Sequence, residues 1–158
     1  MNHCGRFILI CGLPGSGKTT LARTLAADEN AIRFCPDDWM EQMSLNLWDE
    51  NRRGKIEALQ WEIAQNLMTK GLTVIIEWGT WAKSERDTLR ERAQSLGAST
   101  EIHYLSASEE TLFNRIRRRN KEDPPIKRED VTKWFNFFQE PSTQELKLFD
   151  KSQTIFSE

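Results

Sequence analysis

A glycine-rich segment near the N-terminus has the residue types and spacing of a phosphate-binding loop. Residues 12–19 read G-L-P-G-S-G-K-T and fit the pattern G-x-x-x-x-G-K-[ST]. Glycines let consecutive backbone N–H groups turn inward around phosphate oxygens, Lys18 can reach the outer phosphates, and the Thr19 hydroxyl can ligate Mg²⁺. We therefore predict a site for ATP and Mg²⁺. The residues predicted to contact the nucleotide in this segment are Gly12, Pro14, Gly15, Ser16, Gly17, Lys18, Thr19 and Thr20.

The sequence on either side of this loop supplies the strand and the helix that such a loop requires. Residues 6–11 form a short apolar run typical of a strand. Residues 20–27 are rich in helix formers, with Leu21 and Leu25 on one face. A plain glycine turn is the alternative interpretation, and the strand–loop–helix order argues against it.

A pair of aspartates follows the next strand-like segment. Residues 31–35 read as a strand, Pro36 stops it, and Asp37 and Asp38 come directly afterwards. A kinase needs a carboxylate here, facing the γ-phosphate, to orient the acceptor hydroxyl and take its proton. We predict Asp37 as this catalytic base, because Asp38 is the better N-cap for a helix beginning at Trp39. In the alternative interpretation, the pair only caps that helix.

Glu77 ends a third strand-like segment, residues 72–76, which is the most β-prone run of the chain. This is the usual place for the acidic residue that holds Mg²⁺ or its water. We predict Thr19 and Glu77 as the metal ligands. Most P-loop proteins have aspartate here, so the longer Glu77 side chain could instead act through water, contact the acceptor or make a buried structural hydrogen bond.

Arginines are concentrated late in the chain, just before a Pro-Pro loop. Arg115, Arg118 and Arg119 have the i, i+3, i+4 spacing of one helical face, whereas Arg117 points elsewhere. Guanidinium groups neutralise charge on a transferring phosphoryl group. We predict Arg115 and Arg119 as catalytic residues and Arg118 as a nucleotide ligand, in a lid at about residues 115–127. A solvated basic face is the alternative interpretation.

Six tryptophans are present. Four of them lie near the two acidic strand ends in the sequence, namely Trp39, Trp48, Trp78 and Trp81. Indole rings can wall a pocket for a planar or sugar-like molecule, although core packing explains tryptophan equally well. Trp61 and Trp134 have the positions of helix-packing residues. The residues predicted to contact the acceptor are Asp38, Trp39, Trp78 and Trp81.

The composition limits the size, compartment and partners of the protein. A chain of 158 residues is long enough for one domain with its own core. The net charge of −2 gives no overall basic footprint for nucleic acid. The three cysteines lack metal-ligand spacing, and we expect Cys11 and Cys35 in the core because each ends a strand. Since no signal peptide or long apolar stretch is present, we expect a cytoplasmic protein with no membrane partner.

The remaining sequence continues the alternation of strands and helices. We predict further strands at residues 100–105 and 154–156, and helices at residues 38–47, 52–70 and 128–138. The inward side chains of the second of these helices are predicted to be Ile56, Leu59, Ile63 and Leu67. Two more helices are predicted to begin at capping boxes, one at Ser84 and one at Ser106, and to end near Gly97 and Asn120.

This alternation predicts an α/β fold with a single domain over residues 1–158. With right-handed crossovers, it gives a parallel sheet of about five strands sandwiched by helices, the P-loop NTPase arrangement. Ligands gather at the carboxyl ends of such strands. The segments that follow residues 11, 35 and 76 should therefore share one cleft.

These motifs resemble the small P-loop kinases of the AAA-type ATP-binding group, near polynucleotide kinase, chloramphenicol phosphotransferase and zeta toxins. The resemblance covers nearly the whole chain and implies a nucleoside-kinase-like fold that uses ATP and Mg²⁺. Its members phosphorylate very different hydroxyls, so it specifies no acceptor. The segments that carry it are residues 12–22, the Pro36-Asp37-Asp38 sequence with the first aspartate as base, residues 74–79, the lid-like residues 112–120 and the Phe138-x-x-Pro141 segment with Glu145-Leu146.

We therefore predict an ATP-dependent phosphotransferase that acts on a hydroxyl of a small molecule such as a nucleoside, sugar or antibiotic. A 5′-hydroxyl polynucleotide kinase is the second interpretation, since basic clusters at residues 52–55 and 115–121 could form a funnel, although the acidic net charge argues weakly against it. A non-catalytic ATP-binding regulatory protein is the third, and it would need no base such as Asp37. No apolar face is clearly left unassigned, so no oligomeric state is predicted.

Overall fold

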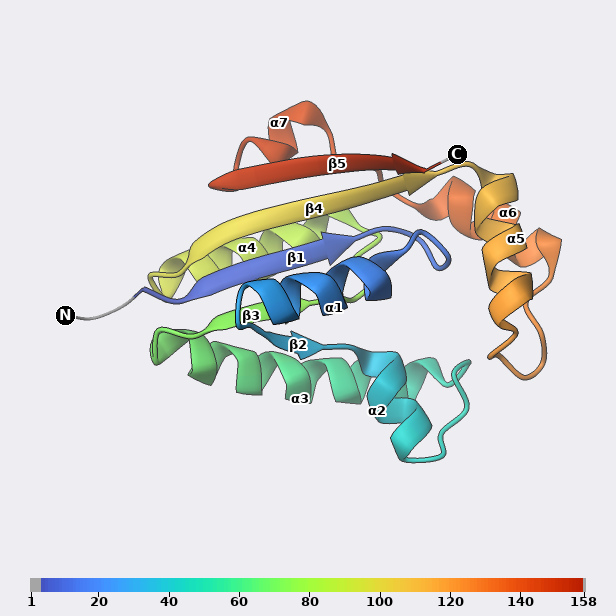
Figure 1. Cartoon of the computed structure of the whole chain (residues 1–158), viewed down its shortest axis with the longest axis horizontal. Helices are drawn as coiled ribbons and strands as arrows, with labels where there is room; N and C mark the ends of the chain where they lie inside the picture. The colour runs from blue at the N-terminus through green and yellow to red at the C-terminus, as the bar shows by residue number, and fades with distance from the viewer. Residues whose placement is uncertain (1–3, 158) are drawn as a thin grey trace.

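Five parallel strands form one sheet at the centre of the computed structural model, which describes residues 4–157 (Figure 1). The order across the sheet is β2-β3-β1-β4-β5, and all neighbouring strands run parallel, which confirms the predicted sheet. The chain leaves β1 towards β2 and β3 on one side and returns to β4 and β5 on the other. The loop after β1 therefore lies where the strand order reverses. The strands are β1 (Arg6–Cys11), β2 (Ile32–Phe34), β3 (Thr73–Ile76), β4 (Ser99–Ala107) and β5 (Lys151–Ser157).

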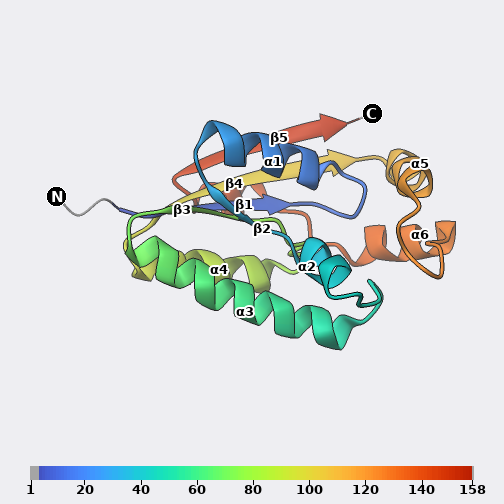
Figure 2. The same cartoon turned by 60° about the horizontal axis from the view of Figure 1, so that its bottom comes forward.

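Helices cover both faces of this sheet, as predicted (Figure 2). Helix α1 (Lys18–Asp28) packs on one face, where Ala22 lies against Ile8 and Ile10 of β1. Helices α3 (Glu50–Thr69) and α4 (Lys83–Ser95) pack on the other face, in the same cluster as Phe7 and Leu9. Successive β1 side chains are thus buried on opposite faces, which accounts for the unbroken apolar run of this strand.

The remaining helices gather mostly beyond the carboxyl ends of the strands (Figures 1 and 2). These are α2 (Pro36–Gln42), α5 (Glu109–Arg119) and α6 (Arg128–Phe137). A separate apolar cluster joins Leu13 of the loop after β1 to Leu112 and Ile116 of α5 and to Val131 of α6. This cluster fixes α5 and α6 beside the predicted phosphate-binding loop.

Three predicted helix starts are wrong, and the first of these helices also ends at Gln42 instead of residue 47. Helix α2 begins at Pro36, because proline is favoured in the first turn of a helix, so Asp38 lies inside the helix and does not cap it. Helix α4 begins after Ala82, where the side chain of Gln139 accepts the amide N–H of Lys83 at 2.8 Å. Helix α5 is capped by Ser108, because β4 continues past Ser106 to pair with the end of β5.

The inward face of α3 agrees with the prediction in part. Its buried residues are Ile56, Gln60, Ala64 and Met68, and the predicted Ile63 and Leu67 pack against the same core while partly buried. The prediction is wrong for Leu59, which is 49% exposed because it lies to the side of the buried i, i+4, i+8, i+12 row. Cys11 and Cys35 are buried, as expected. Within residues 4–157, no helix combines the length and the apolar character needed to cross a membrane.

A buried ion pair connects the short helix α7 (Thr143–Leu146), which the sequence pattern did not predict, to α4. Arg86 Nε lies 2.7 Å from Glu145 Oε1, and Nη2 lies 3.0 Å from Oε2, with both side chains fully or almost fully buried. Arg86 also donates to the main-chain oxygens of Thr80 and Gln139, each at 2.7 Å. One guanidinium thus joins α4, α7 and the loop that follows β3.

Candidate active site

The loop at residues 12–19 connects β1 to the first turn of α1, as the motif requires. Gly15 and Gly17 have φ of +85° and +101°, a region that other residues rarely adopt. An added Cβ on Gly12 would lie 2.8 Å from the Leu105 oxygen, and one on Gly15 would lie 2.8 Å from the Leu112 oxygen. The loop therefore depends on glycine for both its dihedral angles and its close packing.

Lys18 lies at the start of α1 and folds back onto its own loop. Its Nζ atom donates to the Leu13 oxygen at 3.1 Å. Burial lowers the pKa of this amine, and the carboxylates of Glu77 and Asp37 oppose that shift. Both predicted acidic residues are therefore within electrostatic reach of the lysine. Exposed Thr20 follows in the first turn of α1.

Thr19 and Glu77, the predicted metal ligands, are in direct contact. The Thr19 hydroxyl donates to Glu77 Oε1, although the two residues come from different elements. Glu77 is buried directly after β3, and its N–H donates to the Phe34 oxygen at 3.0 Å. Burial raises the pKa of Glu77, and the contacts with Thr19 and Arg33 counteract this.

The oxygens of this pair suit magnesium. Glu77 Oε2 accepts no hydrogen bond within the described part of the chain, although Arg33 Nε lies 3.3 Å away. No group of three or more His, Cys, Asp or Glu side chains that could hold a metal occurs in residues 4–157. Mg²⁺ is usually held by one or two protein oxygens together with phosphate oxygens and water, so one hydroxyl and one carboxylate fit it.

Asp37 and Asp38 have different partners in the first turn of α2. Asp37 Oδ1 lies 2.6 Å from Arg53 Nη1, and its Oδ2 lies 3.5 Å from Lys121 Nζ. Burial alone would raise the pKa of Asp37, but Arg53 and Lys121 hold that pKa below its usual value. Asp38 instead accepts two hydrogen bonds from Arg33, at 2.8 and 2.6 Å. Asp37 is thus the aspartate held ionised near Lys18.

The predicted set of three arginines is divided in the structure. Arg115 Nη1 donates to the Gly15 oxygen at 3.2 Å, directly over the loop. Arg119 pairs with Glu122 at 3.1 Å and is close enough to Lys18 to lower the pKa of that amine. Arg118 lines an open hollow together with Asn114 and Arg117 and makes no hydrogen bond or ion pair to the loop within the described residues, so its predicted role as a nucleotide ligand stays a prediction.

Only part of the predicted tryptophan wall is present. Trp78 is buried, donates to Gln60 Oε1 at 3.0 Å and packs against Trp61, so it belongs to the core and not to a pocket wall. Trp39 is half-buried beside Phe34, at a ring separation of 6.4 Å. The core packing that the sequence left as an alternative therefore accounts for Trp78 and for much of Trp39.

A different group of three rings, the tryptophan triad of Trp48, Trp81 and Trp134, lies near the lid. Trp134 is 6.1 Å from Trp48 and 5.9 Å from Trp81, centroid to centroid. The triad joins α6 to the loops that follow α2 and β3. Trp134 was expected only to pack its helix, because nothing in its spacing relates it to residues 48 and 81.

The loop at residues 120–127, part of the predicted lid and called the lid loop below, is docked on the loop between α2 and α3. Asn46 Nδ2 donates to the Asp123 oxygen, and Trp48 Nε1 donates to the Pro124 oxygen, both at 2.8 Å. Lys121 lies 3.4 Å from Glu41 and also contacts Asp37. The lid loop therefore reaches the predicted base through Lys121.

Sequence reasoning missed the cations that surround the acidic residues. Arg53 and Lys121 belong to the basic clusters interpreted as a funnel, and Arg33 lies on β2 without any motif. The signal available for Arg53 was its place in the first turns of a helix that follows the aspartates. That position does not specify which way the side chain turns.

The comparisons with known proteins agree with this architecture. A family model described as an AAA domain matches residues 7–141. Among solved structures, a candidate kinase from Chloroflexus aurantiacus has a TM-score of 0.73 and 20% identity, over 99% of this chain and 89% of that one. A gluconokinase from Sinorhizobium meliloti has a TM-score of 0.63 and 16% identity, over 98% of this chain and 83% of that one.

Kti12 from Chaetomium thermophilum, in complex with ADP-AlF3, has a TM-score of 0.70 and 18% identity, over 95% of this chain and 88% of that one. At these identities the likeness establishes the fold, an α/β P-loop NTPase. No curated protein sequence matches the chain significantly.

Proposed function

The chain belongs to the AAA domain family, and we propose that it is an ATP-dependent, Mg²⁺-assisted kinase that phosphorylates a hydroxyl of a small molecule. One observation carries the proposal: three neighbouring strand ends bring Lys18, Glu77 and an ionised Asp37 to one place. A protein that only bound the nucleotide would need no such carboxylate. In this proposal, residues 1–158 form one kinase domain, with residues 115–127 as its lid.

The phosphate-binding part of the proposal rests on the loop and the first turn of α1. Main-chain N–H groups of residues 15–19 and the Lys18 amine would hold the phosphates, once Lys18 leaves the Leu13 oxygen. Thr19 and Glu77 would hold Mg²⁺, which neutralises charge on the β- and γ-phosphate oxygens when bound. In this proposal Arg118, which lines an open hollow on α5, would contact another part of the nucleotide.

The transfer step assigns the proton to Asp37. The acceptor oxygen forms a bond to the γ-phosphorus, the bond from that phosphorus to the β,γ-bridging oxygen breaks, and the hydroxyl proton passes to the Asp37 carboxylate. Arg53 keeps this carboxylate ionised and directed. Arg115 and Arg119, which lie beside the loop, would stabilise negative charge on the transferring group.

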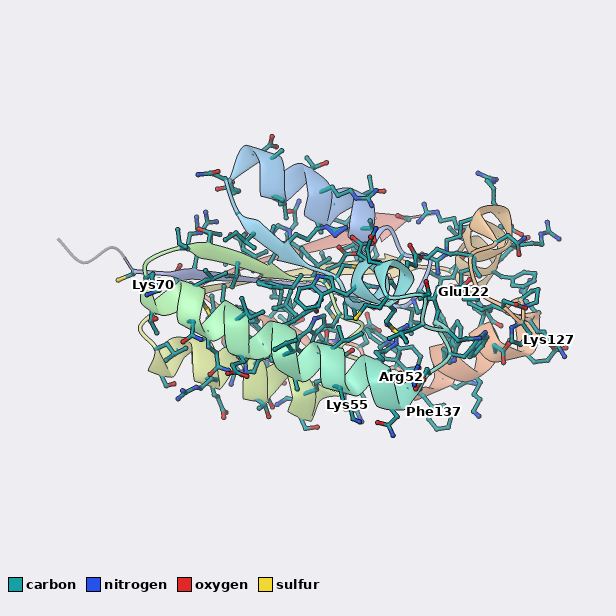
Figure 3. All side chains as sticks on the ribbon, turned by 90° about the horizontal axis from the view of Figure 1, so that it is seen from below. Arg52, Lys55, Lys70, Glu122, Lys127 and Phe137 are labelled. Carbon is teal, nitrogen blue, oxygen red and sulfur yellow. The ribbon has the colours of Figure 1, made fainter. Side chains whose placement is uncertain are left out.

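The surroundings of Asp37 favour a small acceptor over a polynucleotide end. The lid loop is anchored to the α2–α3 loop by Asn46 and Trp48, which narrows access to Asp37. The expected basic funnel is also divided, because Arg52 and Lys55 lie on the outer side of α3 (Figure 3), whereas Arg53 pairs with Asp37. Trp81 and the rest of the tryptophan triad would provide apolar surface beside the acceptor.

The test is ATP consumption in the presence of nucleosides, sugars, aminoglycosides, phenicols or 5′-hydroxyl oligonucleotides. We expect stimulation by one small-molecule class and none by oligonucleotides. With that acceptor, Asp37→Asn should lower kcat by about 10²- to 10⁴-fold and leave ATP binding nearly intact, because only the proton acceptor is lost. Lys18→Ala should lose ATP binding as well as transfer.

The matched control is Asp28→Asn, an exposed carboxylate at the end of α1, which should leave both ATP binding and turnover unchanged. Near-normal turnover in Asp37→Asn would remove the base assignment. Stimulation by oligonucleotides alone would favour the polynucleotide kinase, and ATP binding without stimulation by any hydroxyl compound would favour a regulatory protein.

A further inference from the structure

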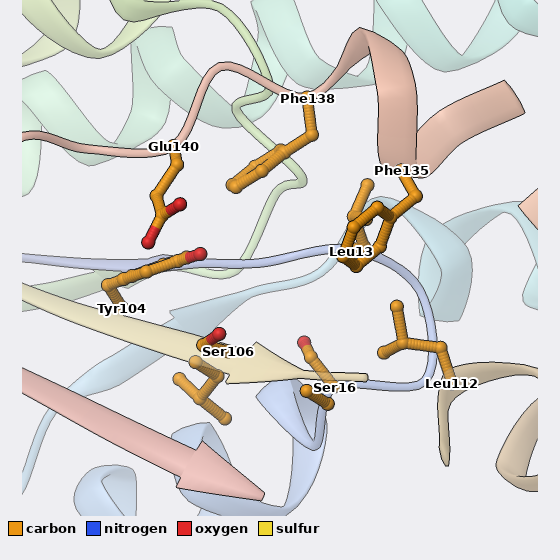
Figure 4. Close-up of a pocket in the computed structure, with 10 residues that line it drawn as sticks. Leu13, Ser16, Tyr104, Ser106, Leu112, Phe135, Phe138 and Glu140 are labelled. Atoms are coloured by element: carbon orange, nitrogen blue, oxygen red, sulfur yellow. The ribbon is translucent and has the colours of Figure 1, made fainter. Parts of the chain in front are cut away.

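A small pocket lies behind the phosphate-binding loop, at the carboxyl end of β4 (Figure 4). Its volume is about 100 Å³, and its walls come from that loop, β4, the start of α5 and the segment around the end of α6. Its polar lining is Ser16, Tyr104, Ser106 and Glu140, and its apolar lining includes Leu112 and Phe135. The pocket therefore combines hydrogen-bonding groups, one carboxylate and apolar surface.

The pocket is separate from the proposed acceptor site. Asp37 and Glu77 follow β2 and β3, which lie on one side of β1. The pocket lies at the end of β4, which is on the other side of β1. A molecule in this pocket would touch the phosphate-binding loop from the side opposite Asp37. It would therefore not be the acceptor whose hydroxyl proton passes to Asp37.

Ser16 provides the first sign that this pocket takes a ligand. The residue is 2% exposed, and its Oγ atom has no hydrogen-bond partner within the described part of the chain. Its side chain points from the phosphate-binding loop into the pocket (Figure 4). A buried hydroxyl without a partner is unfavourable, and a polar atom of a bound molecule would satisfy it.

Glu140 provides the charge of the pocket. Its carboxylate lies beside the Tyr104 ring (Figure 4) and forms no ion pair with any described residue. Burial raises the pKa of Tyr104, so its hydroxyl stays neutral at physiological pH. Arg86 lies 6.0 Å from the Phe138 ring, but its charge is already compensated by Glu145. The charge at this end of the pocket is therefore negative.

Aromatic rings beside that carboxylate favour an organic cation. Tyr104 and Phe138 are stacked, with centroids 5.9 Å apart and an interplanar angle of 17°. Ring faces attract ammonium groups, and the apolar surface of Leu112 and Phe135 suits a short hydrocarbon chain better than a hydrated metal ion. A volume of about 100 Å³ is close to that of three liquid waters, enough for roughly four or five non-hydrogen atoms.

We propose that this pocket binds a short amino alcohol, with the ammonium group at Glu140 and the hydroxyl at Ser16, and that this ligand acts as an effector of the phosphate-binding loop. Since Ser16 is part of that loop, the bound molecule would restrict its motion and raise the affinity for nucleotide. Reciprocity then requires that nucleotide raise the affinity for the amino alcohol by the same factor.

The test uses 3-amino-1-propanol and the nucleotide-free full chain, followed by ¹H–¹⁵N NMR, so it requires no kinase activity. We expect saturable shifts of the Ser16 and Ser106 amides, with a Kd on the order of millimolar for so small a molecule. Binding should be about tenfold weaker or more for 1,3-propanediol, which lacks the charge. Propylammonium, which lacks the hydroxyl, should bind more weakly by a smaller factor.

Variants of the protein separate the charge from general surface effects. Glu140→Gln removes an exposed carboxylate without removing packing, and it should weaken binding of 3-amino-1-propanol by about tenfold or more. Glu129→Gln, an exposed carboxylate on α6, is the matched control and should bind like the wild type. In the wild type, saturating 3-amino-1-propanol should also raise the affinity for ATP several-fold.

Four results would overturn the proposal: no shift at the pocket amides, equal binding of 1,3-propanediol, wild-type affinity in Glu140→Gln, or the same shifts produced by potassium chloride. An unchanged ATP affinity at saturation would overturn the effector role. None of these results depends on whether the protein phosphorylates a small molecule.

Discussion

Arg86→Met removes the cation that pairs with the buried Glu145 carboxylate, and we expect it to destabilise the whole domain. The side chain of Arg86 is fully buried, and Glu145 is 2% exposed. Methionine keeps much of the volume but donates no hydrogen bond, so Glu145 and the Thr80 and Gln139 carbonyls lose the hydrogen bonds that Arg86 donates. Breaking a buried pair in this way costs about 3–5 kcal/mol.

That cost is large compared with the total stability of a domain of this size. The free energy of unfolding of natural domains is about 5–15 kcal/mol, so the variant would lose a substantial fraction of it. At roughly 2–4 °C per kcal/mol, the melting temperature should fall by about 6–20 °C. Urea unfolding of both proteins, extrapolated linearly to water, measures the difference directly.

Two further variants identify the cause. The double variant Arg86→Met, Glu145→Leu removes the stranded charge and should be more stable than Arg86→Met alone. Lys83→Met breaks an exposed pair with Asp87 on the same helix and should cost less than about 1 kcal/mol. A loss below about 1 kcal/mol in Arg86→Met, or no recovery in the double variant, would refute the reasoning that an uncompensated buried charge sets the cost.

Four other substitutions test separate features of the structure. Gly15→Ala places a Cβ 2.8 Å from the Leu112 oxygen at a φ of +85°, so ATP affinity measured by calorimetry should fall by at least about tenfold. Gly54→Ala adds a Cβ in open space on α3, so it should instead raise the free energy of unfolding by about 0.5–1 kcal/mol. Burial and the neighbouring Glu85 raise the pKa of Glu57 from 4.5 to about 7. The stability that Glu57 contributes through its raised pKa is therefore complete below pH 4.5 and is lost as the pH rises through 7. The free energy of unfolding of Glu57→Gln, measured with urea, should therefore rise relative to that of the wild type between pH 5 and pH 8. A difference between the two proteins that does not change with pH would contradict the raised pKa. Trp48→Phe keeps a ring beside Trp134 but loses the donor to Pro124, so hydrogen exchange in residues 121–126 should accelerate by about two- to tenfold, and unchanged exchange would show that this bond does not hold the lid.

The parts of the site that depend on the backbone could be predicted from the sequence. The glycines of the phosphate-binding loop are needed for positive φ and close packing, so their spacing identifies the loop. Asp37 and Glu77 could be located because parallel strands place their carboxyl ends at one edge of the sheet. The predicted strands all occur, and the errors among the helices are their starts, the early end of α2, the exposed Leu59 on α3 and the missing α7.

The parts that depend on side-chain direction could not be predicted. Arg53 and Lys121 both contact Asp37, but Arg53 comes from α3 and Lys121 from the lid loop. Because these segments are far apart in the sequence, no local spacing of residues predicts that both would contact the same carboxylate. Trp78 follows Glu77 directly, and the alternation along an extended segment sends it into the core instead of the cleft. Trp134 joins Trp81 only because α6 packs over the loop that follows β3.

The docking of the lid loop has a consequence for how its sequence can vary. Asn46 and Trp48 both donate to main-chain oxygens, those of Asp123 and Pro124. Every amino acid carries a main-chain carbonyl, so other residues at positions 123 and 124 could still accept these hydrogen bonds. Few residue types could replace Asn46 and Trp48 as side-chain donors. Among relatives that keep this closure, evolutionary drift should therefore be unequal, with residues 123 and 124 diverging faster than residues 46 and 48.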